Sequence, residues 1–267
     1  GGPRKIIKVN LHDYPTAVLA DRAGIDMVMI GDSIGMVVLG YPNTLPVTME
    51  EMIHHTRAVV RGAGKCFVVC DMPFMSYQVN VEDAVRNAGR LIKETGADCV
   101  KMEGGADIKD KVKAVVAAGI PVMGHIGLLP QRVSLLGKYR VQGKDAASAR
   151  LILADALALE EAGVFCVVLE NVTAELGKIV TEKLKVPTLG AGAGPDVDGQ
   201  SMNLYDILGL SLGTMPRFAK RYLNLGEEIP KAFAGYIADV TQGKFPDEEN
   251  YFHMDEEEWK KFRAALP

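Results

Sequence analysis

The chain has 267 residues, of which 48% are hydrophobic and 24% are charged, and its formal net charge is −4. A slightly acidic chain gives no support for nucleic-acid binding through bulk electrostatics. No apolar run approaches the roughly 18 residues that a membrane-spanning helix needs, so no membrane contact is expected. No signal peptide is recognisable at the start of the chain.

The chain contains four cysteines, Cys66, Cys70, Cys99 and Cys166, and each lies in or beside a predicted strand. No two of them form a Cys-x-x-Cys pair, so their spacing does not suggest a zinc site. We expect four buried free thiols, which is the ordinary state of cysteine in a reducing compartment. The cysteine pattern therefore predicts a cytoplasmic protein.

Apolar runs alternate with segments of helical periodicity along most of the chain. Strands are predicted, in chain order, near 6–10, 27–31, 67–71, 98–103, 121–125, 165–170 and 186–190, with a weakly marked eighth near 207–211. Helices are predicted near 14–23, 48–62, 80–95, 107–118, 145–162 and 173–184. Several of these helices end at an Ala-Gly or Gly-Ala pair, and glycine suits the left-handed conformation that commonly ends a helix.

This regular alternation indicates a parallel sheet with right-handed crossovers. An open, doubly wound sheet would show the same alternation. The number of units and the spread of polar residues over many strand ends favour a closed (β/α)8 barrel, which typically takes about 250 residues. We predict a single barrel domain over residues 1–267, with a helical extension from about residue 216. The extension is either a solvated helix or an arm that packs on a neighbouring subunit.

Charged or ionisable side chains stand at the ends of the apolar strands. Asp32, Asp71, His125 and Glu170 each follow an apolar run such as residues 27–30. Continuous apolar runs are typical of strands that are buried on both faces. The carboxyl ends of the strands are where a (β/α)8 barrel keeps its catalytic residues. The pattern therefore predicts an enzyme with an acidic site.

Three carboxylates at strand ends are candidates for a metal site. Asp32 and Asp71 end two strands that would be near neighbours in the barrel, and Glu103 ends another strand nearby. Mg²⁺ prefers oxygen ligands and takes few of them from the protein, because it keeps several waters. A lone aspartate in such a place usually caps the following segment. Two aspartates, with Glu103 nearby, favour a metal site instead.

Lys101 and Glu103 lie two residues apart on one predicted strand, so their side chains point to the same face. Lys101 could hold a substrate carboxylate while Glu103 faces the metal or its water. A buried ion pair that supports the barrel is the alternative.

His125 and Glu170 are the candidates for proton handling. A histidine at the barrel mouth suits proton transfer or substrate hydrogen bonding, although a lone histidine after a strand is more often a core residue. Burial of Glu170 would raise its pKa toward that of a useful general base. Glu170 could instead cap the helix that is predicted from Thr173 onward.

Several motifs, taken in order, resemble those of the ketopantoate hydroxymethyltransferase family from about residue 6 to about residue 253. These motifs are Gly31-Asp32-Ser33-Ile34-Gly35-Met36, Thr44-Leu45-Pro46-Val47-Thr48, Asp71-Met72-Pro73-Phe74-Met75, Lys101-Met102-Glu103-Gly104-Gly105, Gly124-His125-Ile126-Gly127-Leu128-Leu129-Pro130-Gln131, Tyr139-Arg140-Val141-Gln142-Gly143, Asp155-Ala156-Leu157-Ala158-Leu159-Glu160, Gly192-Ala193-Gly194 and Pro216-Arg217-Phe218-Ala219-Lys220.

This resemblance implies a (β/α)8 barrel of the phosphoenolpyruvate/pyruvate type that assembles as a homodecamer. It also implies transfer of a hydroxymethyl group from 5,10-methylenetetrahydrofolate to 3-methyl-2-oxobutanoate, which gives 2-dehydropantoate for pantothenate biosynthesis. Mg²⁺ is then the expected metal, and the small-molecule 2-oxo acid and the folate are the expected partners.

The resemblance implies a role for each candidate residue. Asp32 and Asp71 correspond to ligands of Mg²⁺, and Glu103 lies beside the metal or its water. The remaining assignments are Ser33 and Lys101 for the oxo-acid carboxylate, His125 for a further substrate contact and Glu170 for the base.

The chain departs from the family pattern at positions expected near the pocket. The family usually has Thr-Ala-Tyr-Asp-Tyr where this chain has residues 10–14, so His12 replaces a tyrosine. An imidazole is shorter than a phenol and can carry charge near neutral pH. Asn171 replaces a small residue or cysteine, and residues 201–203 replace an apolar stretch. His12 and Asn171 are therefore candidate specificity residues.

Two alternatives to the family activity stay open at this point. The same barrel and metal chemistry could act on a different 2-oxo acid or with free formaldehyde as donor, or could cleave a C–C bond as lyases of the wider superfamily do. The chain could also be an inactive oxo-acid-binding homologue, although its set of strand-end charged residues argues against that.

Overall fold

The computed structural model describes residues 4–136, 140–213 and 215–267. The chain divides into two compact units, Gly1–Tyr222 and Leu223–Pro267. The first unit holds every candidate site residue. The second contains the helices α10 (Leu225–Thr241) and α11 (Glu256–Ala264) and the short 3₁₀ turn η3 (Glu248–Asn250).

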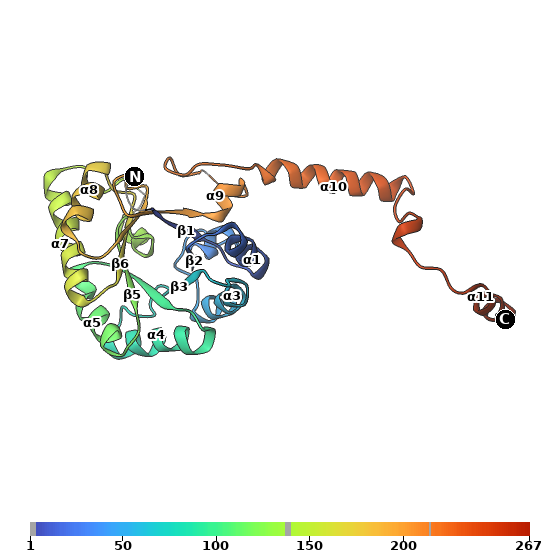
Figure 1. The fold of residues 1–267 in the computed structure, drawn as a ribbon, viewed down its shortest axis with the longest axis horizontal. Helices are drawn as coiled ribbons and strands as arrows, with labels where there is room; N and C mark the ends of the chain where they lie inside the picture. The colour runs from blue at the N-terminus through green and yellow to red at the C-terminus, as the bar shows by residue number, and fades with distance from the viewer. Residues whose placement is uncertain (1–3, 137–139, 214) are drawn as a thin grey trace. The chain divides into compact units, whose positions relative to one another are not determined.

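Eight parallel strands close into a barrel in the first unit (Figure 1), which confirms the predicted fold class. Each strand pairs with the next along the chain, and the last pairs with the first. The strands are β1 (Ile6–Asn10), β2 (Met27–Ile30), β3 (Phe67–Asp71), β4 (Cys99–Glu103), β5 (Val122–Gly127), β6 (Cys166–Glu170), β7 (Thr188–Ala191) and β8 (Gly199–Asn203).

Helices follow the strands and cover the outside of the barrel. Their ends follow ordinary capping chemistry: the side chain of Asp13 accepts a hydrogen bond from the Thr16 amide at the start of α1, and Gly24 ends that helix with a φ of 80°. The helices and turns are α1 (Tyr14–Ala23), α2 (Ile34–Val37), α3 (Met49–Gly62), α4 (Val81–Thr95), η1 (Ala106–Ile108), α5 (Lys109–Ala117), η2 (Pro130–Arg132), α6 (Val133–Leu136), α7 (Ala146–Ala162), α8 (Ala174–Lys183) and α9 (Leu204–Leu208).

The prediction of the eighth strand near 207–211 is wrong. The eighth strand is β8, which pairs with both β7 and β1, whereas residues 204–208 form α9. The apolar pattern misleads because β8 carries only one large apolar side chain, Met202. Its neighbour Ser201 accepts a hydrogen bond of 2.9 Å from Lys8 Nζ of β1, so this part of the barrel wall is polar.

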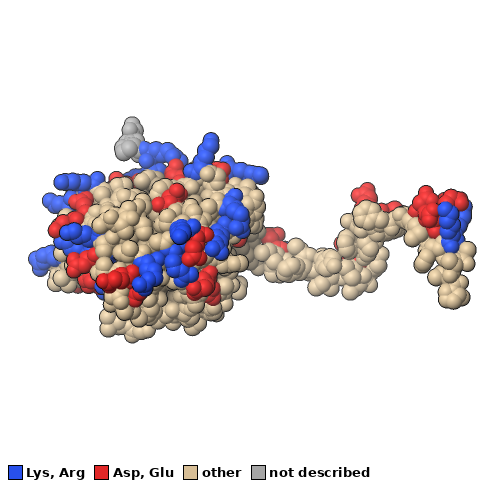
Figure 2. Space-filling model, turned by 90° about the horizontal axis from the view of Figure 1, so that it is seen from below, with Lys and Arg blue, Asp and Glu red and all other residues tan. Residues whose placement is uncertain are grey.

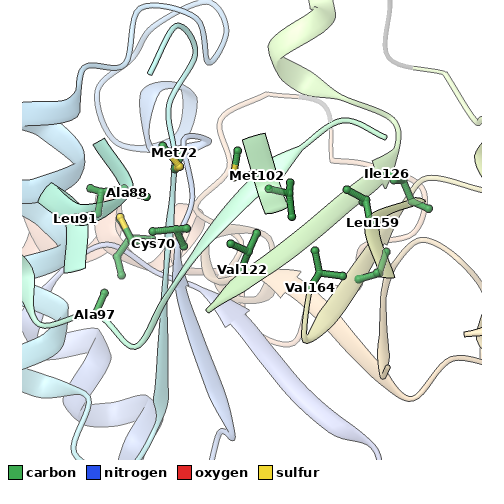
Figure 3. Packing of buried hydrophobic residues seen from close by; sticks show 14 of the residues in the cluster. Cys70, Met72, Ala88, Leu91, Ala97, Met102, Val122, Ile126, Leu159 and Val164 are labelled. Atoms are coloured by element: carbon green, nitrogen blue, oxygen red, sulfur yellow. The ribbon is translucent and has the colours of Figure 1, made fainter. Parts of the chain in front are cut away.

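Two apolar layers stabilise the barrel. The larger one lies between strands and helices, where Figure 3 shows Ala88 and Leu91 of α4 beside Cys70 of β3. Leu159 of α7 packs closely on β5, since a Cβ added at Gly124 would lie 2.7 Å from its Cδ1. The smaller layer fills the barrel with Met27, Met29, Val69, Cys99, Met123, Cys166, Val168 and Leu189. The site therefore stands on a packed interior rather than over a channel.

All four cysteines are buried and free, as predicted. Within the described residues, no helix combines the length and the apolar character that crossing a membrane requires. Figure 2 shows basic and acidic side chains interspersed on one face of the barrel unit, without a large area of one sign.

Candidate active site

The barrel brings the predicted strand-end residues together at one end. Asp71 is the last residue of β3 and pairs in register with Lys101, and Glu103 at the end of β4 pairs with His125. Glu170 is the last residue of β6. Parallel strands that end at the same rim place such side chains within reach of one another, because alternate residues point into the barrel.

Asp71 is held by contacts on both of its carboxylate oxygens. The backbone amide of Asp32, just after β2, donates a hydrogen bond of 3.0 Å to its Oδ2. Lys101 Nζ lies 2.9 Å from its Oδ1, and both side chains of this ion pair are buried. The two aspartates are therefore adjacent, as their strand positions predicted.

His125 lies between two glutamates and is 1% exposed. Its Nδ1 is 3.2 Å from Lys101 Nζ and 3.6 Å from Glu103 Oε2, while its Nε2 is 3.1 Å from Glu170 Oε2. A charged lysine can only donate, so Nδ1 accepts from Lys101 and the imidazole proton sits on Nε2. Burial, followed by Lys101, lowers the pKa of His125, which keeps the ring neutral.

The buried carboxylates repel one another. Burial, and then Asp71, raises the pKa of Asp32 to about 7, and burial together with Asp32 raises that of Glu103. Burial alone would lower the pKa of Lys101, but Asp71, Asp32 and Glu103 outweigh it and raise that pKa. Lys101 is therefore a permanent cation, and the cluster carries more potential negative charge than this one lysine balances.

Glu170 behaves differently from the prediction, which expected burial to raise its pKa. Burial does act in that direction, but His125, Lys101 and Lys8 outweigh it, so the pKa of Glu170 lies below its ordinary value. The Glu170 side chain is 25% exposed. Glu170 is therefore ionised at neutral pH and ready to accept a proton.

The carboxylate cluster suits a divalent cation in its donor chemistry. Asp32 and Asp71 offer hard oxygen ligands, and Ser33 Oγ next to them is buried without a hydrogen-bond partner. A cation there would relieve the repulsion that raises the pKa of Asp32. Over the described ranges, no three His, Cys, Asp or Glu side chains form a complete metal-binding group. The fit is that of Mg²⁺, which takes only one or two carboxylates and keeps its waters.

Gln131 is a site residue that sequence reasoning missed. Its Nε2 donates to Asp32 Oδ2 and to the Met72 carbonyl, both at 2.9 Å, and its backbone amide donates to Glu103 Oε1 at 2.9 Å. Its Oε1 accepts from Tyr77 Oη at 2.9 Å. Gln131 thus ties the loop after β5 to the carboxylates of β2 and β4. Its place in the motif that contains His125 was the available signal.

The sequence also predicts a long loop over residues 126–144; residues 130–136 of this segment form η2 and α6, and residues 137–139 lie outside the described residues. A cavity of about 260 Å³ lies beside the site. Glu103, Tyr77 and Gln131 reach it, and the full lining is Phe74, Tyr77, Gln78, Glu103, Asp107, Ile108, Lys111, Gln131 and Arg132.

Lys8 is the second missed residue. It lies on β1, is 2% exposed, and donates to Asn10 Oδ1 at 2.8 Å and to Ser201 Oγ at 2.9 Å. Burial, and then Lys101, lowers its pKa to about 7. Sequence patterns gave no signal for it, because a lysine in a short strand usually faces solvent.

His12 lies two residues beyond β1, is 1% exposed and stacks on Tyr205 with ring centroids 6.0 Å apart. Burial, and then His55, lowers its pKa to about 3. The expectation that this imidazole carries charge near neutral pH is therefore wrong, because the ring is buried too deeply. Its two nitrogens have no hydrogen-bond partner.

Asn171 follows Glu170 in a left-handed conformation with a φ of 49°. Its amide donates to the Ala191 carbonyl and its carbonyl accepts from the Gln142 amide, both at 2.8 Å. Asparagine tolerates this conformation better than most residues. Asn171 therefore shapes the turn that carries the chain away from Glu170.

Fold and site together define a (β/α)8 barrel with ionisable side chains gathered at the carboxyl ends of its strands, which is the arrangement of barrel enzymes. Solved structures of similar fold include 2,3-dimethylmalate lyase of the PEP mutase/isocitrate lyase superfamily, with a TM-score of 0.60, 15% identity, and coverage of 99% of this chain and 95% of that one. Another is phosphonopyruvate hydrolase in complex with oxalate and Mg²⁺, with a TM-score of 0.60, 14% identity, and coverage of 98% and 93%. These identities establish the fold alone.

Sequence comparison is more specific. The family model described as ketopantoate hydroxymethyltransferase matches residues 2–248. A 3-methyl-2-oxobutanoate hydroxymethyltransferase of Moorella thermoacetica is 57% identical over 93% of this chain and 92% of the relative, and one of Geobacillus sp. is 50% identical over 95% and 91%. The chain belongs to the ketopantoate hydroxymethyltransferase family. Its function is the hydroxymethyl transfer of that family, in pantothenate biosynthesis.

Proposed function

We propose that the chain takes its hydroxymethyl group from 5,10-methylenetetrahydrofolate, uses Mg²⁺, and adds the group to C3 of 3-methyl-2-oxobutanoate to form 2-dehydropantoate. The observation that carries the proposal is the adjacency of Asp32, Asp71 and Lys101 to a partly exposed, ionised Glu170 across one barrel rim. Such a rim offers a cation site, an anchor for a carboxylate and a base in one place.

Asp32 and Asp71 would hold Mg²⁺, with Glu103 beside the metal or its water. The ion would act as a Lewis acid toward the keto oxygen and carboxylate of the acceptor and make its C3 hydrogen more acidic, which supplies several kcal/mol. Gln131 would fix the orientation of Asp32 and Glu103, since it donates to both.

Ser33, Lys101 and His125 would bind the acceptor. The hydroxyl of Ser33 is buried without a partner and can hydrogen-bond a carboxylate. Lys101 keeps its charge because three carboxylates surround it. His125 presents its Nε2 proton on the side of Glu170, where the reacting carbon would lie.

Glu170 would be the general base that removes the C3 proton. It is ionised, it is exposed enough to meet a substrate, and it stands beside a neutral imidazole. A positioned general base typically contributes about 10²- to 10⁴-fold in rate. The resulting carbanion equivalent would then attack the one-carbon unit of the donor, with water supplying the hydroxyl oxygen as the C–N bonds of that unit break and tetrahydrofolate leaves.

A turnover assay tests this proposal. The full chain is incubated with 3-methyl-2-oxobutanoate and Mg²⁺, with and without 5,10-methylenetetrahydrofolate, and 2-dehydropantoate is quantified. We expect product only when both folate and metal are present. Product from free formaldehyde at the same rate would contradict the folate assignment, and full turnover in the presence of a chelator would contradict the metal.

We also propose that the protein works in the cytoplasm as a homo-oligomer, a decamer by family resemblance. Four unpaired buried thiols fit a reducing compartment. Helix α10 carries exposed apolar residues at helical spacing, and an apolar face of this kind suits contact with a second copy of the chain. These residues are Ile229, Phe233, Tyr236, Ile237 and Val240. Sedimentation velocity of the full chain measures the assembly, and a monomer at micromolar concentration would contradict it.

A further inference from the structure

Lys8 is a buried amine with a pKa of about 7, so it is partly charged at neutral pH, and its hydrogen bonds go only to neutral groups. Its Nζ donates to Asn10 Oδ1 at 2.8 Å and to Ser201 Oγ at 2.9 Å, and among the described residues it forms no ion pair with a carboxylate. An ammonium has three donors, so one remains for another partner. Burying a charge without an opposite charge is costly, and proteins ordinarily pair it.

His12, in the loop after β1, also has hydrogen-bonding atoms without a partner among the described residues. It follows Asn10 by two residues, and both of its ring nitrogens are buried without a hydrogen-bond partner. A neutral imidazole always carries one N–H donor and one acceptor, and buried polar groups are nearly always satisfied. Lys8 and His12 therefore have hydrogen-bonding capacity that the described residues do not use.

The strand register connects Lys8 to Glu170. Lys8 pairs with Ser201 on β8, and Glu170 pairs with Ala191 on β7. Gly190, just before Ala191, pairs with Gln200, just before Ser201. Only the short side chains of Ala191 and Ser201 thus separate Lys8 from Glu170 along this row, and the charge of Lys8 is one of those that lower the pKa of Glu170.

The direction of the bound acceptor follows from the proposed function, on which this inference rests. Its carboxylate end would lie at β2 to β4, near Asp71 and Lys101, and its C3 would face Glu170 on β6. Carbons beyond C3 would then meet the remaining part of the rim, formed by β7, β8 and β1. Those three strands end at Ala191, Asn203 and Asn10, and the buried Ser201 and Lys8 lie two residues before Asn203 and Asn10.

We propose that Lys8, anchored by Asn10 and Ser201, binds a second carboxylate on the acceptor side chain, so that the enzyme also accepts dicarboxylic 2-oxo acids. Lys8 supplies the opposite charge and the free donor. The reaction is unchanged in kind: Glu170 takes a proton from C3, and the electron pair of the broken C–H bond forms a C–C bond to the one-carbon unit of the folate donor. Water supplies the hydroxyl oxygen of that unit as its two C–N bonds break, and tetrahydrofolate leaves with the two nitrogens protonated. In D₂O without a donor, C3 regains a deuteron instead.

The test measures C3 hydrogen exchange by proton NMR in D₂O, with Mg²⁺ and without any one-carbon donor. The probes are 2-oxoglutarate and 2-oxopentanoate, which share the same carbon chain and differ only in a terminal carboxylate or methyl group. The proteins are the parent, Lys8→Met, which keeps the length of the side chain and removes its charge, and Ser201→Val, which removes one anchor of Nζ and keeps the charge. Enzyme-free samples give the background exchange.

We expect the parent to favour 2-oxoglutarate, measured as the ratio of kcat/KM values for exchange of the two acids. This ratio should fall at least tenfold in Lys8→Met, mainly through KM, and by a smaller factor in Ser201→Val. An unchanged ratio in Lys8→Met would overturn the proposal and leave Lys8 as a counter-charge for the carboxylate cluster. A parent that exchanges 2-oxopentanoate but not 2-oxoglutarate would overturn it as well.

Titration calorimetry of the same acids separates this inference from the proposed function and does not depend on turnover. If no acid exchanges, the proposed base and metal chemistry fails, while binding still reports on Lys8. Preferential binding of 2-oxoglutarate that Lys8→Met removes supports the inference, and equal binding by both proteins contradicts it. Should Lys8→Met fold poorly by circular dichroism, Ser201→Val tests the anchor instead: a smaller loss of preference for 2-oxoglutarate supports the inference, and an unchanged preference contradicts it.

Discussion

Replacing Gln131 by leucine should destabilise the barrel and disturb the site together. Leucine has a similar volume but cannot donate, so Asp32 Oδ2 and the Met72 carbonyl each lose a donor at 2.9 Å. Tyr77 Oη keeps an acceptor for its one proton, because the Glu103 carbonyl also lies 2.9 Å away. Leaving a buried acceptor unsatisfied costs about 1–3 kcal/mol, so the two acceptors together cost about 2–6 kcal/mol of unfolding free energy.

The same substitution should move the pH dependence of activity. The hydrogen bond from Gln131 lowers the pKa of Asp32, which burial and Asp71 raise. Without that bond the pKa of Asp32 rises further, so the acid limb of the kcat/KM profile should shift to higher pH. We expect kcat to fall by about 10- to 100-fold, because groups that orient a metal ligand typically contribute that much.

Gln78→Leu is the matched control. Gln78 donates to Gln131 Oε1 at 2.9 Å from a partly buried position, so the chemical change is the same, but Gln131 Oε1 keeps Tyr77 Oη as a donor and the carboxylates lose none. Urea unfolding followed by circular dichroism should give a loss below about 1 kcal/mol for Gln78→Leu. A loss of similar size for Gln131→Leu, with an unmoved acid limb, would refute the assignment of Gln131 as a positioning residue.

Two further predictions concern the metal. Asp71→Asn should lower kcat by at least about 100-fold and abolish the dependence of kcat on Mg²⁺, because Lewis-acid stabilisation supplies several kcal/mol. Full activity of this variant without added metal would contradict the assignment of Asp71 as a metal ligand. The second prediction concerns pH. The pKa of Asp32 is about 7 in the folded chain without metal and 3.8 ordinarily. The free energy of unfolding that the protonated Asp32 contributes is therefore fully present below about pH 4 and is lost as the pH rises through 7. Mg²⁺ binds the ionised form, so the rise in Tm that Mg²⁺ causes should grow between pH 5.5 and about 8; a rise independent of pH would contradict this link.

The positions of the main site residues could be predicted because parallel barrel strands are buried on both faces. Their apolar runs are visible in the sequence, and the residue that ends each run lies at the rim. Asp71, Glu103 and Glu170 are the last residues of β3, β4 and β6, as expected. The rule failed for β8, where the interior is lined by polar side chains such as Ser201 and leaves no apolar run.

Residues that act through contacts across the barrel could not be predicted. Gln131 reaches Asp32 and Glu103 from a loop, and no local pattern encodes that reach. The pKa of Glu170 depends on His125, Lys101 and Lys8, which come from three other strands. The sequence showed the burial that raises this pKa but not the cations that lower it, so the predicted sign was wrong.

The central claim is that Glu170 is the base that removes the C3 hydrogen, and hydrogen exchange measures this most directly. The experiment incubates 3-methyl-2-oxobutanoate with the Mg²⁺-loaded protein in D₂O and follows the C3 signal by proton NMR for the parent and for Glu170→Gln. The amide keeps the shape of the side chain but cannot accept the proton, so we predict loss of exchange by about 10²-fold or more with oxo-acid binding retained. Unchanged exchange in Glu170→Gln would place the base elsewhere, with His125 as the next candidate.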